Sequence, residues 1–209
     1  MSDYYSHSRP ELRPYLPEQY RRVLEVGCAE GRFAGNYLPG TEVWGVEPSS
    51  AAGQAAKVLH RAFAGTFEQC ATELPEGYFD LLVINDVIEH MPDDAGFLQA
   101  VQAKLAPGAM VMGSIPNMRY WPVLRALIFQ GEWRYTDEGV LDRTHLRFYT
   151  QRSFRRLLEE NGFTVMRFGG INNSLSRSRR FWLWLFSAGR LDDVGFLQFA
   201  FLAQRKPRD

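Results

Sequence analysis

The chain has 209 residues, and its 24 Lys and Arg balance its 24 Asp and Glu, so its formal net charge at pH 7 is zero. This length allows one core of sizeable burial and no linker composition divides it, so we expect a single domain over residues 1–209. Balanced charge excludes a protein whose overall field attracts nucleic acid, and two cysteines without paired spacing exclude a disulfide framework. No apolar signal-peptide core begins the chain, so a cytoplasmic location is expected.

The first twenty residues are polar, aromatic and interrupted by proline, and they include Tyr4, Tyr5 and Tyr15. One interpretation is a surface arm that packs against the first helix. The other is a flap whose tyrosines close over a bound ligand. The sequence leaves both interpretations open.

Residues 22–47 predict a strand, a Gly-rich turn, a short helix and a second strand that ends on an acid. Gly27 allows a sharp turn off the first strand, and Gly31 lets the helix begin close to the strand ends. Glu47 lies twenty residues beyond Gly27, where a carboxylate can accept hydrogen bonds from two ribose hydroxyls. This pattern is typical of the nucleoside-binding half of a doubly wound α/β fold.

The turn lacks the middle glycine of the dinucleotide fingerprint and carries Glu30 instead. Glu30 would repel a pyrophosphate, whereas a nucleoside with an amino group and a positive centre would not be repelled. VLEVGCAEG followed by GVEPS resembles the class I S-adenosylmethionine-dependent methyltransferases. The resemblance implies S-adenosyl-L-methionine as cofactor, held by Glu25, Gly27, Cys28, Ala29, Gly31, Glu47 and Pro48.

A short Ala-rich helix to about residue 59 and a short strand at 62–64 are predicted next, followed by Gly65-Thr66-Phe67-Glu68. By resemblance, this strand-to-helix loop holds the adenine. Thr66 takes the position where the family often has an acid, and Phe67 is able to stack on the base. A plain core role for Phe67 is an equal alternative.

Residues 79–85 predict a buried central strand around the apolar run 81–84, and this strand ends on Asn85-Asp86-Val87-Ile88-Glu89-His90. Strand ends line the crevice of a doubly wound sheet, so we expect Asn85 and Asp86 beside the reacting methyl group. The DVIEH segment and the later LAPGA turn into a fifth strand are two further matches to the same family.

A helix opening at Asp86 would place Asp86, Glu89 and His90 on one face, where they could bind a divalent metal. We favour ordinary helix-start chemistry, with acids near the positive end of the helix dipole and His90 as a wall of the site. No metal is therefore assigned.

Residues 117–147 form an aromatic, mixed-charge insert, with a helix predicted from Tyr120 to Phe129. An extra element over the strand ends is where a substrate lid is built. The DRTHLRFYT segment resembles a branch of class I methyltransferases that is often associated with bacterial glycan and cell-surface biosynthesis. The resemblance implies methylation of an oxygen or nitrogen on a small or carrier-linked acceptor, such as a glycan or a lipid-linked metabolite.

Methyl transfer to a hydroxyl needs a group that removes a proton. His145 in the insert is the first candidate, His90 is the second, and Asp86 is a further catalytic candidate. The alternative for His145 is structural, because Asp142, Arg143 and His145 could clamp the insert to the body by ion pairs.

A helix from Thr150 to Glu160 and strands at 163–168 and 195–204 complete the chain. By resemblance, the α/β fold has a mostly parallel seven-stranded sheet of order 3-2-1-4-5-7-6, with the last strand antiparallel.

Between these strands, residues 176–190 place a basic cluster beside Trp and Phe in an apolar run too short to span a bilayer. This composition fits weak contact with a membrane surface. We favour instead an apolar helix that docks on the sheet or in a homodimer interface.

Three functions remain open. The intact Gly27, Gly31 and Glu47 favour a methyltransferase acting on a small-molecule or carrier-linked acceptor, with no nucleic acid as partner. A non-catalytic scaffold that kept the fold is the alternative. The missing middle glycine disfavours a nicotinamide oxidoreductase.

Overall fold

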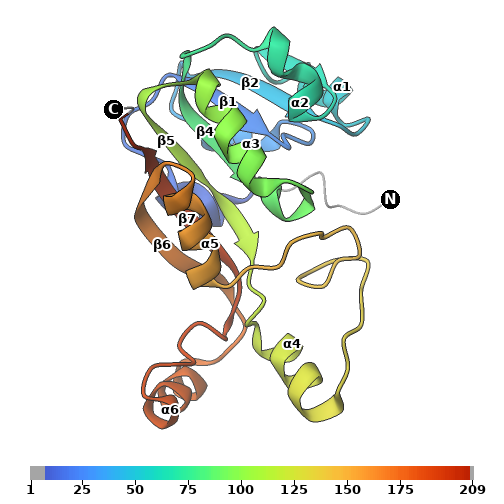
Figure 1. Ribbon diagram of the computed structural model, residues 1–209, viewed down its shortest axis with the longest axis vertical. Coiled ribbons are helices and arrows are strands. Elements are labelled where there is room, and N and C mark those ends of the chain that lie inside the picture. The colour runs from blue at the N-terminus through green and yellow to red at the C-terminus, as the bar shows by residue number, and fades with distance from the viewer. Residues whose placement is uncertain (1–7, 208–209) are drawn as a thin grey trace.

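The computed structural model describes residues 8–207, and its centre is a seven-stranded sheet of order β3-β2-β1-β4-β5-β7-β6 (Figure 1). The strands are β1 (Arg22–Val26), β2 (Glu42–Glu47), β3 (Arg61–Ala64), β4 (Phe79–Asn85), β5 (Leu105–Pro116), β6 (Phe163–Asn173) and β7 (Phe196–Arg205). The first five strands pair in parallel, and β7 runs antiparallel to both β5 and β6. The predicted strand order and the antiparallel last strand are confirmed.

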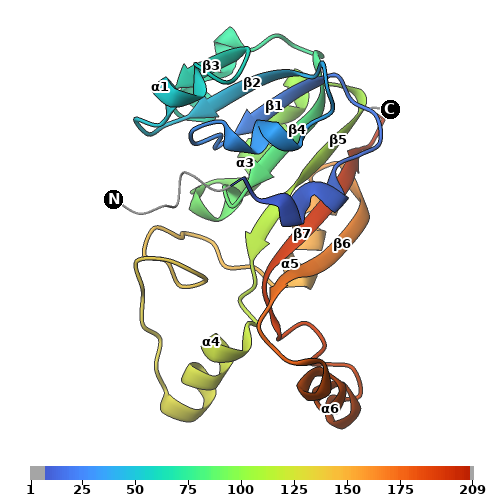
Figure 2. The ribbon, with the colours of Figure 1, turned by 180° about the vertical axis from the view of Figure 1, so that it is seen from behind.

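Helices cover both faces of this sheet. The α-helices are α1 (Ala52–Ala55), α2 (Phe67–Cys70), α3 (Asp94–Val101), α4 (Trp121–Arg125), α5 (Gln151–Glu160) and α6 (Arg177–Ser187). The 3-10 turns are η2 (Pro10–Tyr15), η3 (Arg32–Asn36), η4 (Ala71–Glu73), η5 (Ile88–His90) and η6 (Gln102–Lys104), and η7 (Ala126–Gln130) is a π-helical turn. One apolar core lies under α2, α3 and α5, and the other lies under η2, η3 and α1 (Figures 1 and 2).

The central strands are apolar on both faces because both faces are covered. In β4, Leu81, Leu82 and Val83 are fully buried although successive side chains point to opposite faces. This two-sided burial accounts for the unbroken apolar run that predicted a buried strand. Parallel pairing of β1, β2, β3 and β4 brings their carboxyl ends together at one edge of the sheet.

Some predicted boundaries differ from the structure. The Ala-rich helix predicted up to about residue 59 is limited to α1. On either side of α1, most backbone amides donate to the carbonyl oxygen three residues earlier, as in a 3-10 helix, and not to the one four residues earlier. The strand predicted at 163–168 continues to Asn173 as β6, since it pairs along its length with β7. The helix predicted in the insert is confirmed as α4 continuing into η7.

Two helical segments extend away from the sheet at one end of the molecule. These are α4 with η7, and α6 (Figures 1 and 2). The preferred prediction is that residues 176–190 dock on the sheet or in a homodimer interface. Docking on the sheet is wrong for the described side chains, because Phe181 and Trp184 are more than half exposed. The homodimer interface stays a prediction. None of the described helices is long and apolar enough to cross a membrane.

Candidate functional site

A cavity of about 1570 Å³ opens at the edge where β1, β2, β3 and β4 end. The loops that follow these four strands form its walls, and η5, α3 and the insert after α4 complete them. Four parallel strands that end together leave room between the loops that diverge from them. The cavity therefore lies where the sequence predicted the cofactor site.

The loop after β1 depends on two glycines with positive φ. Gly27 has φ 73°, and a Cβ there would lie 2.4 Å from Val87 Cγ2 in the loop after β4. Gly31 has φ 78° and packs against Leu59 behind the loop, away from the cavity lining. Gly27 thus forms part of the cavity wall, and Gly31 shapes the turn behind it.

Glu47 joins the loops after β1 and β2. Its side chain lies on the cavity wall and is almost fully buried. Oε2 accepts a hydrogen bond from the Ala29 amide, and Oε1 accepts one from the Ser49 amide, each 2.9 Å long. Ala29 is held with φ 46°, which a non-glycine residue rarely adopts. Each carboxylate oxygen keeps a second lone pair, so Glu47 can also accept hydrogen bonds from a ligand. Pro48 completes this part of the wall.

Glu25 and Cys28, two predicted cofactor contacts, do not line the cavity. Glu25 is buried, its Oε2 accepts a hydrogen bond from the Tyr37 hydroxyl at 2.9 Å, and burial raises its pKa to about 8. The Cys28 thiol points at the sheet, because a Cβ on Gly45 would lie 2.5 Å from its Sγ. Burial also raises the pKa of this thiol, which keeps it neutral.

The loop after β3 contributes the residues predicted beside the adenine. Thr66, Phe67 and Glu68 line the cavity, and Thr66 caps α2 through a capping box with Gln69. Phe67 is only 2% exposed and packs edge-to-face on Phe97 at 5.2 Å, so it is both core and cavity wall. Sequence reasoning missed Glu68, although an acid three residues after Gly65 was a usable signal.

The cavity wall is strongly acidic. Seven of the described lining residues are Asp or Glu and none is Lys or Arg: Glu47, Glu68, Asp86, Asp93, Asp137, Glu138 and Asp142. At the end of β4, Asn85 Oδ1 is buried and has no hydrogen-bond partner among the described residues. An unsatisfied acceptor in an acidic cavity favours a ligand that donates hydrogen bonds and carries positive charge.

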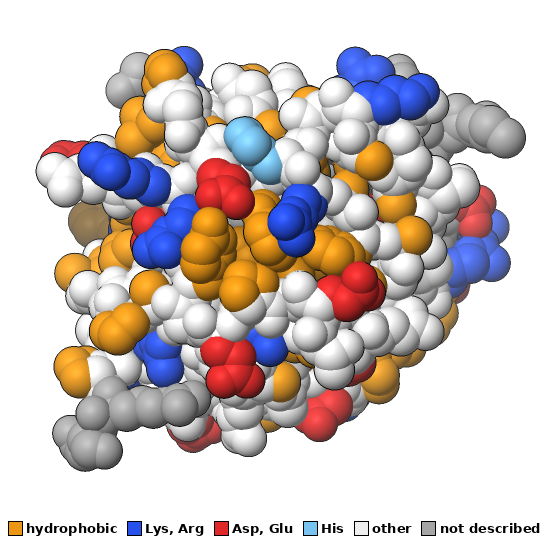
Figure 3. Space-filling view, turned by 90° about the horizontal axis from the view of Figure 1, so that it is seen from above, with side chains coloured by type: hydrophobic (Ala, Val, Ile, Leu, Met, Phe, Trp, Pro, Cys, Tyr) orange, Lys and Arg blue, Asp and Glu red, His pale blue; other side chains and the backbone are white. Residues whose placement is uncertain are grey.

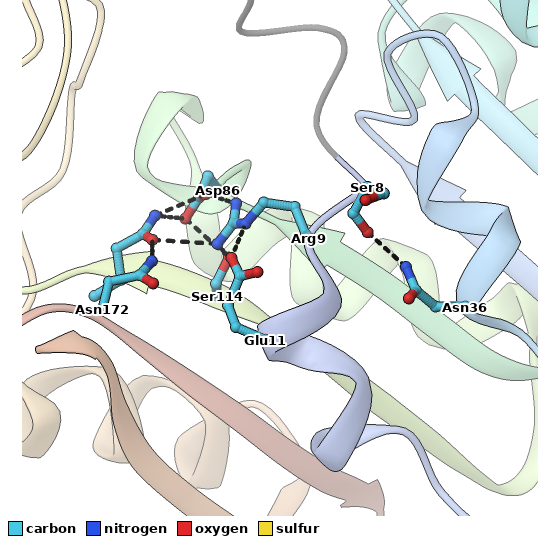
Figure 4. A network of polar contacts seen from close by, with 8 residues as sticks. Ser8, Arg9, Glu11, Asn36, Asp86, Ser114 and Asn172 are labelled. Carbon is cyan, nitrogen blue, oxygen red and sulfur yellow. Dashed lines mark hydrogen bonds and ion pairs between the residues drawn. The ribbon is translucent and has the colours of Figure 1, made fainter.

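Asp86 is held by a network of polar groups from distant elements (Figure 4). Its carboxylate pairs with Arg9 and accepts hydrogen bonds from Ser114 Oγ at 2.9 Å and from Gln198 Nε2 at 2.8 Å. Asp86 has φ 52° and does not open a helix, since η5 begins only at Ile88. The predicted one-face arrangement of Asp86 with Glu89 and His90 is therefore wrong, because the left-handed backbone turns Asp86 toward Arg9.

Arg9 places the N-terminal arm over the ends of β4, β5 and β7. It donates to Ser114 Oγ and Gln198 Oε1 as well as pairing with Asp86. Tyr15 lies elsewhere, against β6, where a Cβ on Gly169 would be 2.4 Å from its hydroxyl. Tyr4 and Tyr5, the other tyrosines of the predicted flap, lie outside the described residues. Sequence reasoning did not single out Arg9, because its partners are up to 189 residues away.

His90 and His145 lie together, with ring centroids 4.8 Å apart. His90 lines the cavity, whereas His145 is 8% exposed and lies outside the lining. The Nδ1 atoms face the Thr144 and Val140 carbonyl oxygens at 3.2 and 3.0 Å. A carbonyl oxygen only accepts, so each Nδ1 carries the hydrogen and each Nε2 is left as an acceptor in the neutral ring. Of the two histidines, His90 is therefore the one on the cavity wall, and the choice of base between them stays a prediction.

The environment of His90 keeps its ring neutral. Burial lowers its pKa below the ordinary value, and the charge of a protonated His145 would lower it further. A neutral imidazole with a free Nε2 on a cavity wall can accept a proton at pH 7.

Glu89 is buried behind the two histidines. It is fully inaccessible, neither carboxylate oxygen has a hydrogen-bond partner among the described residues, and burial raises its pKa well above the ordinary range. Glu89, His90 and His145 each offer one possible metal ligand, a carboxylate oxygen or an imidazole nitrogen, and these three atoms lie within 4.8 Å of one another. These three residues, in place of the predicted triplet with Asp86, could hold a divalent metal.

The insert is fixed to itself and to the body. Asp142 Oδ1 accepts hydrogen bonds from the Thr144 amide and hydroxyl, and the Leu146 and Arg147 amides donate to the Glu89 carbonyl. Arg143 pairs with Asp137 at 2.6 Å on the surface. Asp142, Arg143 and His145 thus bind other residues of the insert, and the insert is joined to the body here by the Leu146 and Arg147 amides and not by the predicted ion pairs. Asp142 and Thr144 also line the cavity.

Comparison with known proteins agrees with this geometry. The chain matches a family described as "Methyltransferase domain" over residues 1–167. It is 30% identical over 160 residues to the ubiquinone biosynthesis O-methyltransferase of Nitrobacter winogradskyi, covering 72% of this chain and 59% of the relative. It is 29% identical over 130 residues to the trans-aconitate 2-methyltransferase of Methylobacterium radiotolerans, covering 59% of this chain and 50% of that one. The chain thus spans between a half and three fifths of the length of these relatives.

Solved structures share the fold. A SAM dependent methyltransferase from Archaeoglobus fulgidus superposes with a TM-score of 0.67 at 20% identity, covering 97% of both chains. A SAM-dependent methyltransferase of Thermotoga maritima, described as a possible histamine N-methyltransferase, gives a TM-score of 0.65 at 19% identity, covering 97% of this chain and 89% of that one. At these identities the likeness shows the fold alone.

Proposed function

Because the chain belongs to the methyltransferase domain family, we propose that it transfers a methyl group from S-adenosylmethionine to an oxygen or nitrogen atom of a small or carrier-linked acceptor. One observation carries the proposal: the cavity at the strand ends is lined by seven acidic side chains and by no Lys or Arg among the described residues. A cationic nucleoside is attracted by this wall, whereas the pyrophosphate of a dinucleotide is repelled by it.

The residues present fit such a cofactor. Glu47 would accept hydrogen bonds from the ribose, with Gly27 and Ala29 supplying backbone beside it. Thr66, Phe67 and Glu68 would border the base, and Asn85 would accept a hydrogen bond from the amino group. Bound S-adenosylmethionine supplies an electrophilic methyl group on a sulfonium.

The acceptor side of the cavity favours a group without negative charge. Asp137, Glu138 and Asp142 come from the insert and line the wall near His90. An anionic acceptor would be repelled by these carboxylates, whereas a neutral hydroxyl or an amine would not. We therefore propose that the group which receives the methyl is neutral or cationic. If the acceptor is attached to an anionic carrier, that carrier lies outside the cavity.

His90 is the group best placed to move a proton. Its Nδ1–H is fixed on the Thr144 carbonyl, so its Nε2 is free to accept the proton of an acceptor hydroxyl. His145 packs against the ring and acts as a positioning residue. Asp86 is occupied by Arg9, Ser114 and Gln198, so it shapes the wall and does not serve as the base.

Calorimetry tests the proposal directly. We expect S-adenosylhomocysteine to bind and NAD to give no heat, because the acidic wall repels a pyrophosphate. Binding of neither ligand would support the non-catalytic scaffold, and binding of NAD alone would support an oxidoreductase. Transfer of labelled methyl to neutral, cationic and anionic candidate acceptors then tests the preference for uncharged or positive groups. Transfer only to anionic acceptors would contradict it.

A further inference from the structure

The end of the molecule formed by α4, η7 and α6 has an unusual surface. Of the thirteen large apolar side chains that are exposed in the described part of the chain, seven lie on these two short segments. They are Leu127, Ile128 and Phe129 on η7, and Phe181, Trp182, Trp184 and Leu185 on α6. Exposed apolar side chains in this concentration mark a surface that contacts something other than water.

Both segments leave the sheet without packing on it. None of the ten residues of α4 and η7 is buried, and Phe129 is 72% exposed. The exposed residues of α6 lie three and four positions apart, so one side of the helix presents Phe181, Trp182 and Leu185 together. An apolar helix gains stability when such a side is covered, and here Phe181 and Leu185 remain about half exposed.

The two segments themselves are basic. Residues 119–131 and 174–190 contain six arginines and no Asp or Glu, although the whole chain has no net charge, and the acids Glu132, Asp192 and Asp193 follow just after them. At the opposite end of the molecule, acidic and basic side chains lie among the apolar ones (Figure 3). Helical segments of aromatic, aliphatic and arginine side chains are complementary to a bilayer with anionic lipid headgroups.

The bases of the two segments are joined. Arg119, just before α4, donates to the carbonyl oxygen of Arg190, just after α6, at 2.5 Å and pairs with Asp193 at 3.1 Å. A cavity of about 520 Å³ between them is lined by Arg119, Arg152 and Arg190 together with Asp192 and Asp193. This cavity thus contains basic and acidic side chains together, and it joins the bases of the two segments.

We propose that α4, η7 and α6 form one docking surface for an anionic membrane, with the apolar side chains in the headgroup–acyl boundary and the arginines against phosphates. The surface lies at the same edge of the sheet as the insert that borders the catalytic cavity. A second copy of the chain is a poorer occupant, because a two-fold contact would place the same arginines opposite one another. The proposal does not depend on the methyl-transfer activity.

Vesicle co-sedimentation of the full chain tests this surface. We expect binding to phosphatidylcholine vesicles that contain phosphatidylglycerol, weaker binding to pure phosphatidylcholine, and a loss of binding at high salt. Phe129→Ser and Trp184→Ser should each weaken the partition by about tenfold or more, since each removes an apolar group from the interface. Arg179→Gln should weaken it by about fivefold, the effect of one charge near an anionic surface.

Val58→Ser is the matched control. Val58 is 59% exposed, like the residues tested, but lies on the other end near α1, so this variant should bind vesicles as the wild type does. Unchanged melting temperatures will show that all the variants fold. The proposal is overturned by absence of wild-type binding, by equal binding of the Phe129 and control variants, or by a stable dimer in sedimentation velocity that the Trp184 variant abolishes.

Discussion

The cavity at the strand ends and the docking surface of α4, η7 and α6 are built in opposite ways. In the cavity, two of the acidic side chains are held by specific partners: Glu47 by two amides, and Asp86 by Arg9, Ser114 and Gln198. On the docking surface, side chains such as Phe129 and Trp184 are exposed. Ligand binding in the cavity therefore depends on where single atoms lie. Membrane binding by the docking surface depends on how many apolar and basic side chains it presents. Single substitutions should affect the two regions very differently.

The largest effect is expected at His90. His90→Gln should lower the turnover number by about 10²–10⁴-fold, because it removes the proton acceptor on the cavity wall, while cofactor affinity changes little. Steady-state kinetics with an identified hydroxyl acceptor, beside calorimetry with S-adenosylhomocysteine, measures both quantities. Activity that survives exhaustive chelation assigns His90 to proton transfer, and activity lost on chelation and restored by a divalent cation assigns it to a metal held with Glu89 and His145. Full activity of the His90 variant would contradict both roles.

Glu25 should have the next largest effect, on stability. Its folded-state pKa of about 8 lies above its unfolded value of 4.5, so the stability it contributes is complete below pH 4.5 and is lost as pH rises through 8. Glu25→Gln stays uncharged and should be more stable than the wild type by up to about 3 kcal/mol at pH 7, with almost no difference at pH 4. Urea unfolding at both pH values checks this prediction. Glu76→Gln, at an 80% exposed side chain, is the control that should show no such difference.

Glu47 tests the cofactor side of the cavity. Glu47→Ala should weaken binding of S-adenosylhomocysteine by about 1.5–3 kcal/mol, the size of a lost hydrogen bond to a charged group. Part of this loss will come from the freed Ala29 and Ser49 amides, so Glu47→Gln, which keeps one acceptor oxygen, should lose less. An unchanged dissociation constant for the alanine variant, measured by calorimetry, would remove Glu47 from the site.

The smallest effect is expected on the docking surface. Phe129→Ser should change the free energy of unfolding by less than about 0.5 kcal/mol and leave cofactor affinity unchanged, because the side chain is exposed and packs on nothing in the body. Thermal unfolding in the absence of vesicles measures this. A loss of several kcal/mol would show that η7 packs on the body, and the contrast between the two regions would then be wrong.

The sequence by itself determined the fold and the place of the cavity at the strand ends. Apolar runs at 23–26, 43–46 and 79–85 predicted buried parallel strands, and Gly27 and Glu47 marked the ends of the first two. These features are local, since a run of apolar residues, a turn that needs positive φ and an acid after a strand are all read from neighbouring residues.

Only the tertiary structure decided which residues meet. His90 and His145 have similar surroundings in the sequence, yet one lines the cavity and the other packs behind it. Asp86 is turned to Arg9, and Glu89 is left buried beside two imidazoles, because a left-handed residue after β4 ends the strand without starting a helix. Whether residues 176–190 pack on the sheet was also a tertiary question, since an apolar helix has the same local pattern whether the body or a membrane covers it.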